Sequence, residues 1–443
     1  MPGGLSTDLY ELNMAASYLR RGMDGLATFS LYVRDMPKQR GFLVSAGLED
    51  CLRFLETYGF EDEELAYLRE VGFDDRAIED FRTTSFEGEV WAVPEGRIVH
   101  AKEPIVEVTA PIAQAQLVEA VLLNQVTLHT TLTSKAARYM LAAEGRMLVD
   151  FAFRRAHGVE AARAAARGSA IVGFEGTSNV EAAREFGLRV TGTMAHSFIT
   201  AFDDERDAFR AFAEDHPNRT TFLVDTYDTI AGVRHAIEVI GEMDLAGEVG
   251  VRLDSGDLDR LSREARRLLD HAGLDRAKIF ASGGLDEHEV AELVRAGAPV
   301  DAFGIGTQLG VSADAPYVDA VYKLVEFDGR PVLKLSPAKA TAPGRKQVWR
   351  GPWEDMIGLR DEAAPGPNHE PLLEPVMRAG RRLAPPPTME EMHARFARDL
   401  TALPVKAARL THPEHVVAHR TEALAALTTE TAEAARRRIR SSD

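Results

Sequence analysis

The residues best suited to chemistry are polar or small ones that directly follow short apolar runs between positions 148 and 310. One of them is His196, in the stretch "VTGTMAHSFITAF", where Thr193 lies three positions earlier. A histidine at the end of a strand can act as a base or as a nucleophile when a neighbouring acceptor orients its ring. A structural role is the alternative, and the residues around His196 do not decide between the two.

Two further apolar runs end in charged residues. The run "VGVRLDSGD" carries Arg252, which could hold a carboxylate or a phosphate, and Asp254, which could bind sugar hydroxyls. The run "TFLVDTYDT" carries Asp225 and Asp228, which could bind ribose hydroxyls or Mg²⁺. The alternative for Asp228, and the interpretation that we favour for Asp257, is an N-cap that accepts a backbone N–H at the start of a helix.

Glycine-rich turns end the last two runs, at "SGG" (Ser282–Gly284) and "GIGTQLG" (Gly304–Gly310). Glycines in such turns let backbone N–H groups face an anion, and the start of a following helix adds a favourable dipole. The stretch "RRAHG" places Arg154 and Arg155 after another run, which would make the same rim electropositive. Together these turns and arginines favour a substrate that carries phosphate.

The spacing of the runs indicates the scaffold that positions these residues. Val224, Val251, Phe280 and Phe303 lie 27, 29 and 23 residues apart, with helical patterns between them. This spacing is typical of βα units in a parallel sheet, where the chemistry gathers at the carboxyl ends of the strands. We therefore predict an α/β fold with an irregular (β/α) barrel, and an open doubly wound sheet is the alternative. Earlier strands of the barrel are expected at 148–153, 169–174 and 188–194.

An additional α+β domain is expected from the N-terminal region, residues 1–130. A helical pattern covers residues 8–22, with Asp8 and Glu11 as a capping pair. Alternating apolar residues in "ATFSLYV", "EVWAV" and "PIVEVTA" predict strands, and a long helix is expected over about 113–144.

The barrel domain is expected to span residues 131–345. Near its end, "VYKLVEFDGRPVLKLS" predicts a hairpin that turns at Asp328 and Gly329. Residues 346–443 are interpreted as a C-terminal segment that packs on the N-terminal domain. Within this segment we expect a proline-rich linker near 365–387 and a helical tail.

Composition narrows the class of protein. The 443 residues include 52 basic and 69 acidic side chains, a net charge of −17, which argues against nucleic acid or an anionic membrane as partner. A single cysteine excludes an intramolecular disulfide and a cysteine-based zinc site. The first residues lack the pattern of a signal peptide, and no apolar run approaches the ~20 residues of a membrane helix. A cytoplasmic enzyme is the expectation.

Nine motifs in this order resemble the nicotinate phosphoribosyltransferases, which are type II phosphoribosyltransferases. They are "TDLYELNMA", "FAFRRAHG", "GTSNV", "GTMAHSF", "VDTYD", "RLDSGDL", "ASGGLDE", "GIGTQLG" and "KLSPAKATAPGRKQVWR". The resemblance implies that nicotinate and 5-phosphoribosyl 1-diphosphate react to nicotinate mononucleotide and diphosphate, in NAD salvage. It also implies ATP as a co-substrate, hydrolysed through a phosphorylated His196, and Mg²⁺ bound through the substrate phosphates rather than by a protein metal site.

The same resemblance implies roles for individual residues. Thr193 and Arg252 would hold nicotinate, and Tyr10 would stack on its ring from the neighbouring subunit of a homodimer. Besides His196, the implied catalytic residues are Asp225 and Asp254. The other implied substrate contacts are Phe151, Arg154, Ser178, Gly283, Gly284, Gly306 and Thr307.

Other functions stay open at this point. Nicotinamide or quinolinate could replace nicotinate, although the arginines of "FAFRRAHG" favour a ring with a carboxylate. A phosphate-binding lyase or isomerase barrel would need a Schiff-base lysine at a strand end, and the predicted strand ends contain none. A binding or scaffold protein without activity is a third class, which the polar residues at every strand end disfavour.

Overall fold

The chain forms two compact units in the computed structural model, which describes residues 3–245, 247–336, 341–352 and 354–441. Unit 1 comprises Met1–Thr131 and Tyr317–Asp443, and unit 2 comprises Leu132–Pro316. Part of the motif "KLSPAKATAPGRKQVWR", residues 337–340, therefore lies outside the described residues. Among the described residues, no helix combines the length and the apolar character needed to cross a membrane.

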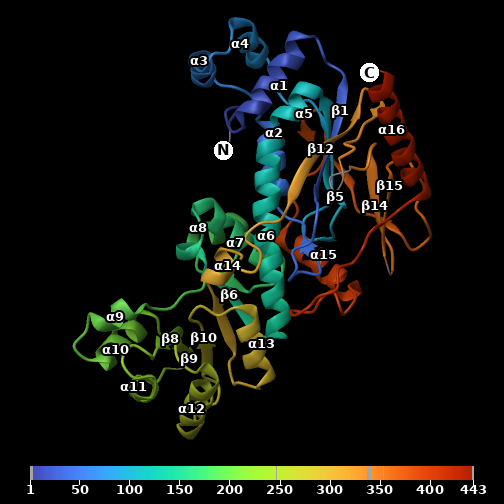
Figure 1. The fold of residues 1–443 in the computed structure, drawn as a ribbon. Helices are drawn as coiled ribbons and strands as arrows, with labels where there is room; N and C mark the ends of the chain where they lie inside the picture. The colour runs from blue at the N-terminus through green and yellow to red at the C-terminus, as the bar shows by residue number, and fades with distance from the viewer. Residues whose placement is uncertain (1–2, 246, 337–340, 353, 442–443) are drawn as a thin grey trace. The chain divides into compact units, whose positions relative to one another are not determined.

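Unit 1 is built around an antiparallel sheet with the strand order β13-β12-β1-β5-β3-β17-β18. A smaller sheet, β16-β14-β15-β19, has helix α16 packed against β15, and Figure 1 shows this helix in red. The strands of unit 1 are β1 (Leu26–Val33), β2 (Leu43–Val44), β3 (Glu89–Ala92), β4 (Ile98–Val99), β5 (Pro104–Pro111), β12 (Ala320–Phe327), β13 (Arg330–Pro331), β14 (Lys346–Arg350), β15 (Asp355–Leu359), β16 (Glu370–Pro371), β17 (Glu374–Arg378), β18 (Arg381–Arg382) and β19 (His419–Arg420). Its helices are α1 (Leu9–Arg20), α2 (Leu48–Glu56), α3 (Asp62–Val71), α4 (Asp75–Arg82), α5 (Ile112–Leu117), α15 (Met389–Ala402) and α16 (Glu422–Ser441).

The hairpin predicted before the C-terminal segment is confirmed, and it belongs to unit 1. Strands β12 and β13 are joined by Asp328 and Gly329, which have φ values of 51° and 71°. Two residues with positive φ are the signature of a type I′ hairpin turn. The barrel was expected to extend to residue 345, but β12 pairs with β1 and the chain therefore returns to the unit 1 sheet at Ala320.

Two local predictions in unit 1 are wrong. Residues 365–387 are not merely a linker, because β17 within them pairs with β3 and extends the sheet. Asp8 and Glu11 do not form a capping pair, because Asp8 makes no side-chain cap and Glu11 is buried against the hydroxyl of Thr7. Burial decides the role of Glu11, and helix periodicity alone could not show it.

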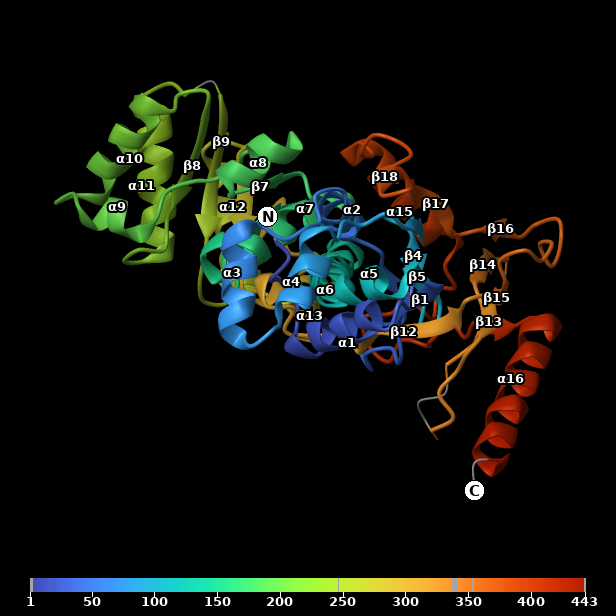
Figure 2. The same cartoon turned by 90° about the horizontal axis from the view of Figure 1, so that it is seen from above.

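Unit 2 contains a curled, half-barrel sheet of parallel strands in the order β7-β6-β11-β10-β9-β8, which confirms the predicted irregular barrel. Helices α10, α11 and α12 pack on β8, β9 and β10, and Figure 2 shows them in green and yellow. The strands are β6 (Met147–Asp150), β7 (Gly176–Thr177), β8 (Arg219–Leu223), β9 (Glu248–Leu253), β10 (Lys278–Ala281) and β11 (Ala302–Ile305). The helices are η1 (Phe153–Arg155), α7 (Val159–Ile171), α8 (Val180–Phe186), α9 (His196–Thr200), α10 (Glu205–Asp215), α11 (Thr229–Glu242), α12 (Leu258–His271), α13 (Glu287–Arg295) and α14 (Thr307–Gly310).

Two predicted strands of the barrel are not strands. Residues 169–171 are the last turn of α7, and the run 188–194 contributes only an isolated bridge at Val190. Short apolar runs do not distinguish a buried strand from the apolar end of a helix, and here the run continues the alanine-rich α7. The long helix expected over 113–144 is also divided, into α5 and α6 (Glu119–Ala143), and α6 crosses the boundary between the units.

A buried group of opposite charges holds the start of α13 within unit 2. Glu287, the first residue of α13, accepts from Lys135 Nζ at 2.5 Å and from Arg138 Nε at 2.6 Å. Lys135 Nζ also lies 3.2 Å from Asp314, and all four side chains are at most 5% exposed. Burial alone would raise the pKa of Glu287, but the two cations outweigh it and lower this pKa. Glu287 is therefore ionised, and its negative charge compensates the charges of two buried cations.

We predict that Glu287→Ala lowers the free energy of unfolding by about 3–5 kcal/mol, because it leaves buried cations without their partner. Urea unfolding of the full chain, followed by circular dichroism, measures the change. The matched control is Glu292→Ala, an exposed residue of the same helix, which should stay within about 0.5 kcal/mol of the wild type. Equal effects of the two substitutions would show that the buried ion pairs do not hold α13.

Candidate active site at the carboxyl ends of the barrel strands

The guanidinium of Arg252 connects several of the predicted site residues. Its Nε donates to Ser282 Oγ at 2.8 Å, Nη2 donates to Asp254 Oδ1 at 2.7 Å, and Nη1 donates to Thr193 Oγ1 at 3.1 Å. A longer contact of 3.5 Å joins Nη1 to the carbonyl oxygen of Met194. Of the five N–H donors of a guanidinium, four are therefore used, and one on Nη2 remains for a ligand.

Asp254 lies between Arg252 and His196. Its Oδ1 accepts from Arg252 and from the Ser282 hydroxyl, and its Oδ2 lies 3.8 Å from His196 Nε2. Burial alone would raise the pKa of Asp254, but the Ser282 hydrogen bond and the charges of Arg252 and His196 outweigh it and lower the pKa. Asp254 is thus kept as a carboxylate that faces the imidazole.

His196 is the first residue of α9, and its side chain is 45% exposed. Its Nδ1 lies 3.1 Å from the hydroxyl of Thr226, which follows β8. This contact accounts for one ring nitrogen and leaves Nε2 on the side of Asp254. The arrangement fits a ring oriented for chemistry at Nε2 rather than one enclosed in the core.

Asp225 lies next to this group, and its carboxylate can still accept hydrogen bonds. Its Oδ2 accepts from the backbone N–H of Asp254 at 3.0 Å and from Ser255 Oγ at 2.7 Å. Its Oδ1 is buried and has no hydrogen-bond partner in the described part of the chain. The N-cap interpretation is confirmed for the two neighbouring acids, since Asp228 accepts from Ala231 N and Asp257 from Arg260 N.

Two aromatic rings form an apolar wall beside Arg252. The guanidinium lies 5.3 Å from the centre of the Phe151 ring, and this ring stacks on Phe280 with centroids 5.7 Å apart. A Cβ on Gly304 would lie 2.6–2.7 Å from both rings, so only glycine leaves them room. A flat ring that carries an anion would find both an aromatic surface and a cation here.

The glycine turns supply unused backbone donors. Gly283 and Gly284 have positive φ, and a Cβ on Gly283 would lie 1.9 Å from the carbonyl oxygen of Asp254. Thr307 is the first residue of α14 after Gly306, so its N–H has no partner inside the helix. Among the described residues, the N–H groups of Gly283, Gly284 and Thr307 donate to no protein acceptor. These turns can therefore accept the oxygens of a phosphate.

Three predicted residues are not joined to this group. Arg154 is exposed on η1, and the N–H of Ser178 donates to Asp150 O at 2.8 Å. Tyr10 lies in unit 1, is 47% exposed, and its hydroxyl is 3.2 Å from Glu11 Oε1. Their substrate contacts stay predictions.

Sequence reasoning missed Asp150, which is fully buried at the carboxyl end of β6. Its carboxyl accepts from the N–H of Ala152 at 2.8 Å and from the hydroxyl of Thr177 at 2.6 Å, and so joins the Phe151 loop to β7. An acid inside an otherwise apolar run was the only signal in the sequence. Ser282 and Thr226 were also missed, because their partners lie 30 positions away in the chain.

We predict that Asp150 stabilises the fold more at low pH than at neutral pH. An acid in a salt bridge does the reverse. Burial raises the pKa of Asp150 to about 6, against the effect of its hydrogen bonds. Because the folded state binds this proton more tightly than the unfolded state, stability falls as pH rises from about 4 to above 6. Relative to Asp150→Asn, the wild type should gain up to about 3 kcal/mol on acidification across this window.

Urea unfolding of both proteins between pH 4 and pH 8 measures this difference. Exposed Asp275→Asn is the control and should follow the wild type at every pH. A constant difference between Asp150→Asn and the wild type would contradict the assigned protonation.

Comparison with known proteins identifies the family of this chain. Models of the nicotinate phosphoribosyltransferase N-terminal domain, family and C-terminal domain match residues 5–127, 147–352 and 366–428. A nicotinate phosphoribosyltransferase of Mycobacterium tuberculosis is 47% identical over 410 residues, which are 91% of this chain and 88% of the relative. One from Bacillus subtilis is 45% identical over 78% of this chain and 72% of its own length. The crystal structure of human nicotinic acid phosphoribosyltransferase superposes with a TM-score of 0.86 at 28% identity, over 96% of this chain and 99% of that one. The chain therefore belongs to the nicotinate phosphoribosyltransferase family.

Proposed function

We propose that the protein joins nicotinate to 5-phosphoribosyl 1-diphosphate, and that the reaction takes place around Arg252 at the carboxyl ends of the barrel strands. The observation that carries this proposal is the position of Arg252, between the Phe151 ring and the carboxylate of Asp254. The free N–H on Nη2 supplies a donor for the carboxylate of nicotinate, and Phe151 supplies a face for its ring. The Thr193 hydroxyl donates to Met194 O at 3.3 Å and would have to turn from that carbonyl to reach nicotinate. Nicotinamide lacks the negative charge that this guanidinium would bind.

The chemistry needs few groups from the protein. In the proposed reaction the pyridine nitrogen attacks C1 of the ribose, the N–C bond forms, and the C–O bond to diphosphate breaks. The pyridine nitrogen is a nucleophile at neutral pH, so no strong base is required. The site must hold two anions together and stabilise positive charge on the ribose carbon. The carboxylates of Asp225 and Asp254 can stabilise that charge, and the turns at Gly283, Gly284 and Thr307 can hold the 5-phosphate.

The described residues also fit Mg²⁺ held partly by the substrate. No group of three or more His, Cys, Asp or Glu side chains that could hold a metal ion occurs among the described residues. Asp225 Oδ1 is a buried acceptor without a partner, and carboxylate oxygen is a preferred ligand of Mg²⁺. We assign Asp225 as the residue that would hold the ion, together with diphosphate oxygens, and the ion would neutralise the leaving group.

We further propose that ATP phosphorylates His196 at Nε2. If Nδ1 carries the proton and donates it to Thr226, the lone pair of Nε2 is free to attack the γ-phosphorus. An N–P bond then forms while the P–O bond to ADP breaks. The Nε2 side of the ring faces Asp254, so the phosphohistidine would lie beside the proposed nicotinate site. A homodimer in which Tyr10 stacks on the ring of nicotinate in the neighbouring subunit, and a cytoplasmic location, stay predictions.

Substrate choice tests the central proposal. The wild type should convert nicotinate with 5-phosphoribosyl 1-diphosphate and prefer it over nicotinamide. Arg252→Gln should lower kcat/KM for nicotinate roughly 10- to 100-fold, since hydrogen bonds to charged groups contribute about 1.5–3 kcal/mol, and should affect nicotinamide less. Exposed Arg260→Gln is the control. A preference of the wild type for nicotinamide, or an equal loss for both substrates in Arg252→Gln, would contradict the assigned role.

Labelling tests the phosphohistidine. Incubation with ATP labelled in the γ-phosphate should give an acid-labile, base-stable phosphoprotein, and His196→Ala should abolish the label. Thr226→Val should reduce the rate of labelling, because it removes the partner that orients Nδ1. His271→Ala, at the far end of α12, is the control. Label that persists in His196→Ala would refute the assignment.

A further inference from the structure

A cavity of unit 2 opens at the amino-terminal ends of the barrel strands, opposite to the candidate active site. It has a volume of about 730 Å³, within the range of sites for small organic ligands. Its rim includes the first residues of β8, β9 and β10, which are Arg219, Glu248 and Lys278. Of the residues proposed to bind nicotinate and phosphate, Thr193 alone lines this cavity, and the others lie at or beyond the carboxyl ends of the strands.

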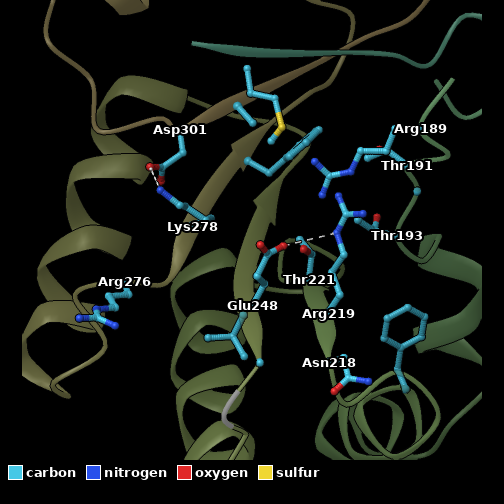
Figure 3. A pocket seen from close by; sticks show the side chains of 17 residues that line it. Arg189, Thr191, Thr193, Asn218, Arg219, Thr221, Glu248, Arg276, Lys278 and Asp301 are labelled. Carbon is cyan, nitrogen blue, oxygen red and sulfur yellow. Dashed lines mark hydrogen bonds and ion pairs between the residues drawn. The ribbon is translucent and has the colours of Figure 1, made fainter. Parts of the chain in front are cut away.

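The charge of this cavity is unusual for the protein. Its lining contains four cations and two acids, a net charge of +2, whereas the whole chain carries −17. Arg219 pairs with Glu248 at 3.8 Å, and Lys278 pairs with Asp301 at 3.0 Å. Arg189 and Arg276 pair with no carboxylate among the residues that the structure describes. Figure 3 shows them on opposite sides of the cavity, and Arg189 is the one that lies beside Arg219.

Part of the cavity lining is apolar. Met147, Phe212, Val249, Phe280 and Ala302 line it, with Thr191, Thr193 and Thr221 as neutral polar groups. Figure 3 shows the side chains of Arg189 and Arg219 extending into the same part of the cavity from two different segments. An anion such as phosphate would leave most of this volume and the apolar wall unused. A flat ring joined to an anionic group matches both parts.

We propose that this cavity is a second binding site, for a small organic anion that contains one flat ring. Its position and charge do not depend on the proposed function, but the choice of ligand does. Nicotinate and nicotinate mononucleotide both have this chemistry, one as substrate and the other as product. The ring would contact Phe280, and the anionic group would bind Arg189 on the side of the cavity where Arg219 also lies.

Calorimetric titration of the full chain with nicotinate, with nicotinate mononucleotide and, separately, with inorganic phosphate tests the proposal. Arg189→Gln should weaken one class of sites at least tenfold. Gly192→Val should do the same without a change in charge, because Gly192 lines the cavity and a Cβ there meets no atom within 4 Å. Exposed Arg295→Gln is the matched control and should bind as the wild type does.

The two sites can be told apart with Arg252→Gln. A site that persists in Arg252→Gln but is lost in both cavity variants supports the proposal, even if the wild type turns over no nicotinate. Binding that is lost in Arg252→Gln and unchanged in the cavity variants overturns it. If phosphate binds and neither ring-bearing ligand does, the assigned ligand class is wrong. The ring-bearing ligand that binds more tightly identifies substrate or product as the occupant.

Discussion

The hydrogen bonds of the Arg252 guanidinium are the interaction on which the rest of the site depends. A cation whose side chain is only 10% exposed must have its charge and its donors satisfied. Its partners come from the end of β9, from the turn after β10 and from the segment before α9. One side chain therefore fixes the relative positions of three loops. Asp254 supplies the opposite charge that allows this cation to be buried.

Two acids near the strand ends, the half-buried Asp254 and the fully buried Asp150, have pKa values shifted in opposite directions. Asp254 has a cation beside it and a lowered pKa, whereas Asp150 has only neutral donors and a pKa raised to about 6. Environments that separate the pKa values of neighbouring acids commonly separate their roles as well. Asp254 keeps the charge that faces His196, and Asp150 holds the loop of Phe151 in place. Replacing Asp254 would therefore remove the charge that faces His196, whereas replacing Asp150 would release the loop of Phe151.

The sequence predicted the strand ends better than it predicted the contacts between them. The later apolar runs, at β8 to β11, were bounded by turns and helices and were found correctly, as were the N-caps Asp228 and Asp257. The run at 169–174 failed because a buried strand and the apolar end of α7 have the same local pattern. The pairing of Arg252 with Ser282 depends on which strands are neighbours, and no local pattern contains that information.

The cavity at the amino-terminal ends could not be predicted for the same reason. The cavity requires small side chains on neighbouring strands at the same height in the sheet. Strand pairing provides them, since Thr221 lies beside Gly250 and Ala302 lies beside Phe280. Alternate residues of a strand share a face, so Lys278, Phe280 and Ser282 follow one another from the cavity to the proposed active site. At ~3.3 Å per residue this path is only about 13 Å long. Phe280 lines the cavity and also stacks on Phe151, so one side chain contributes to both sites.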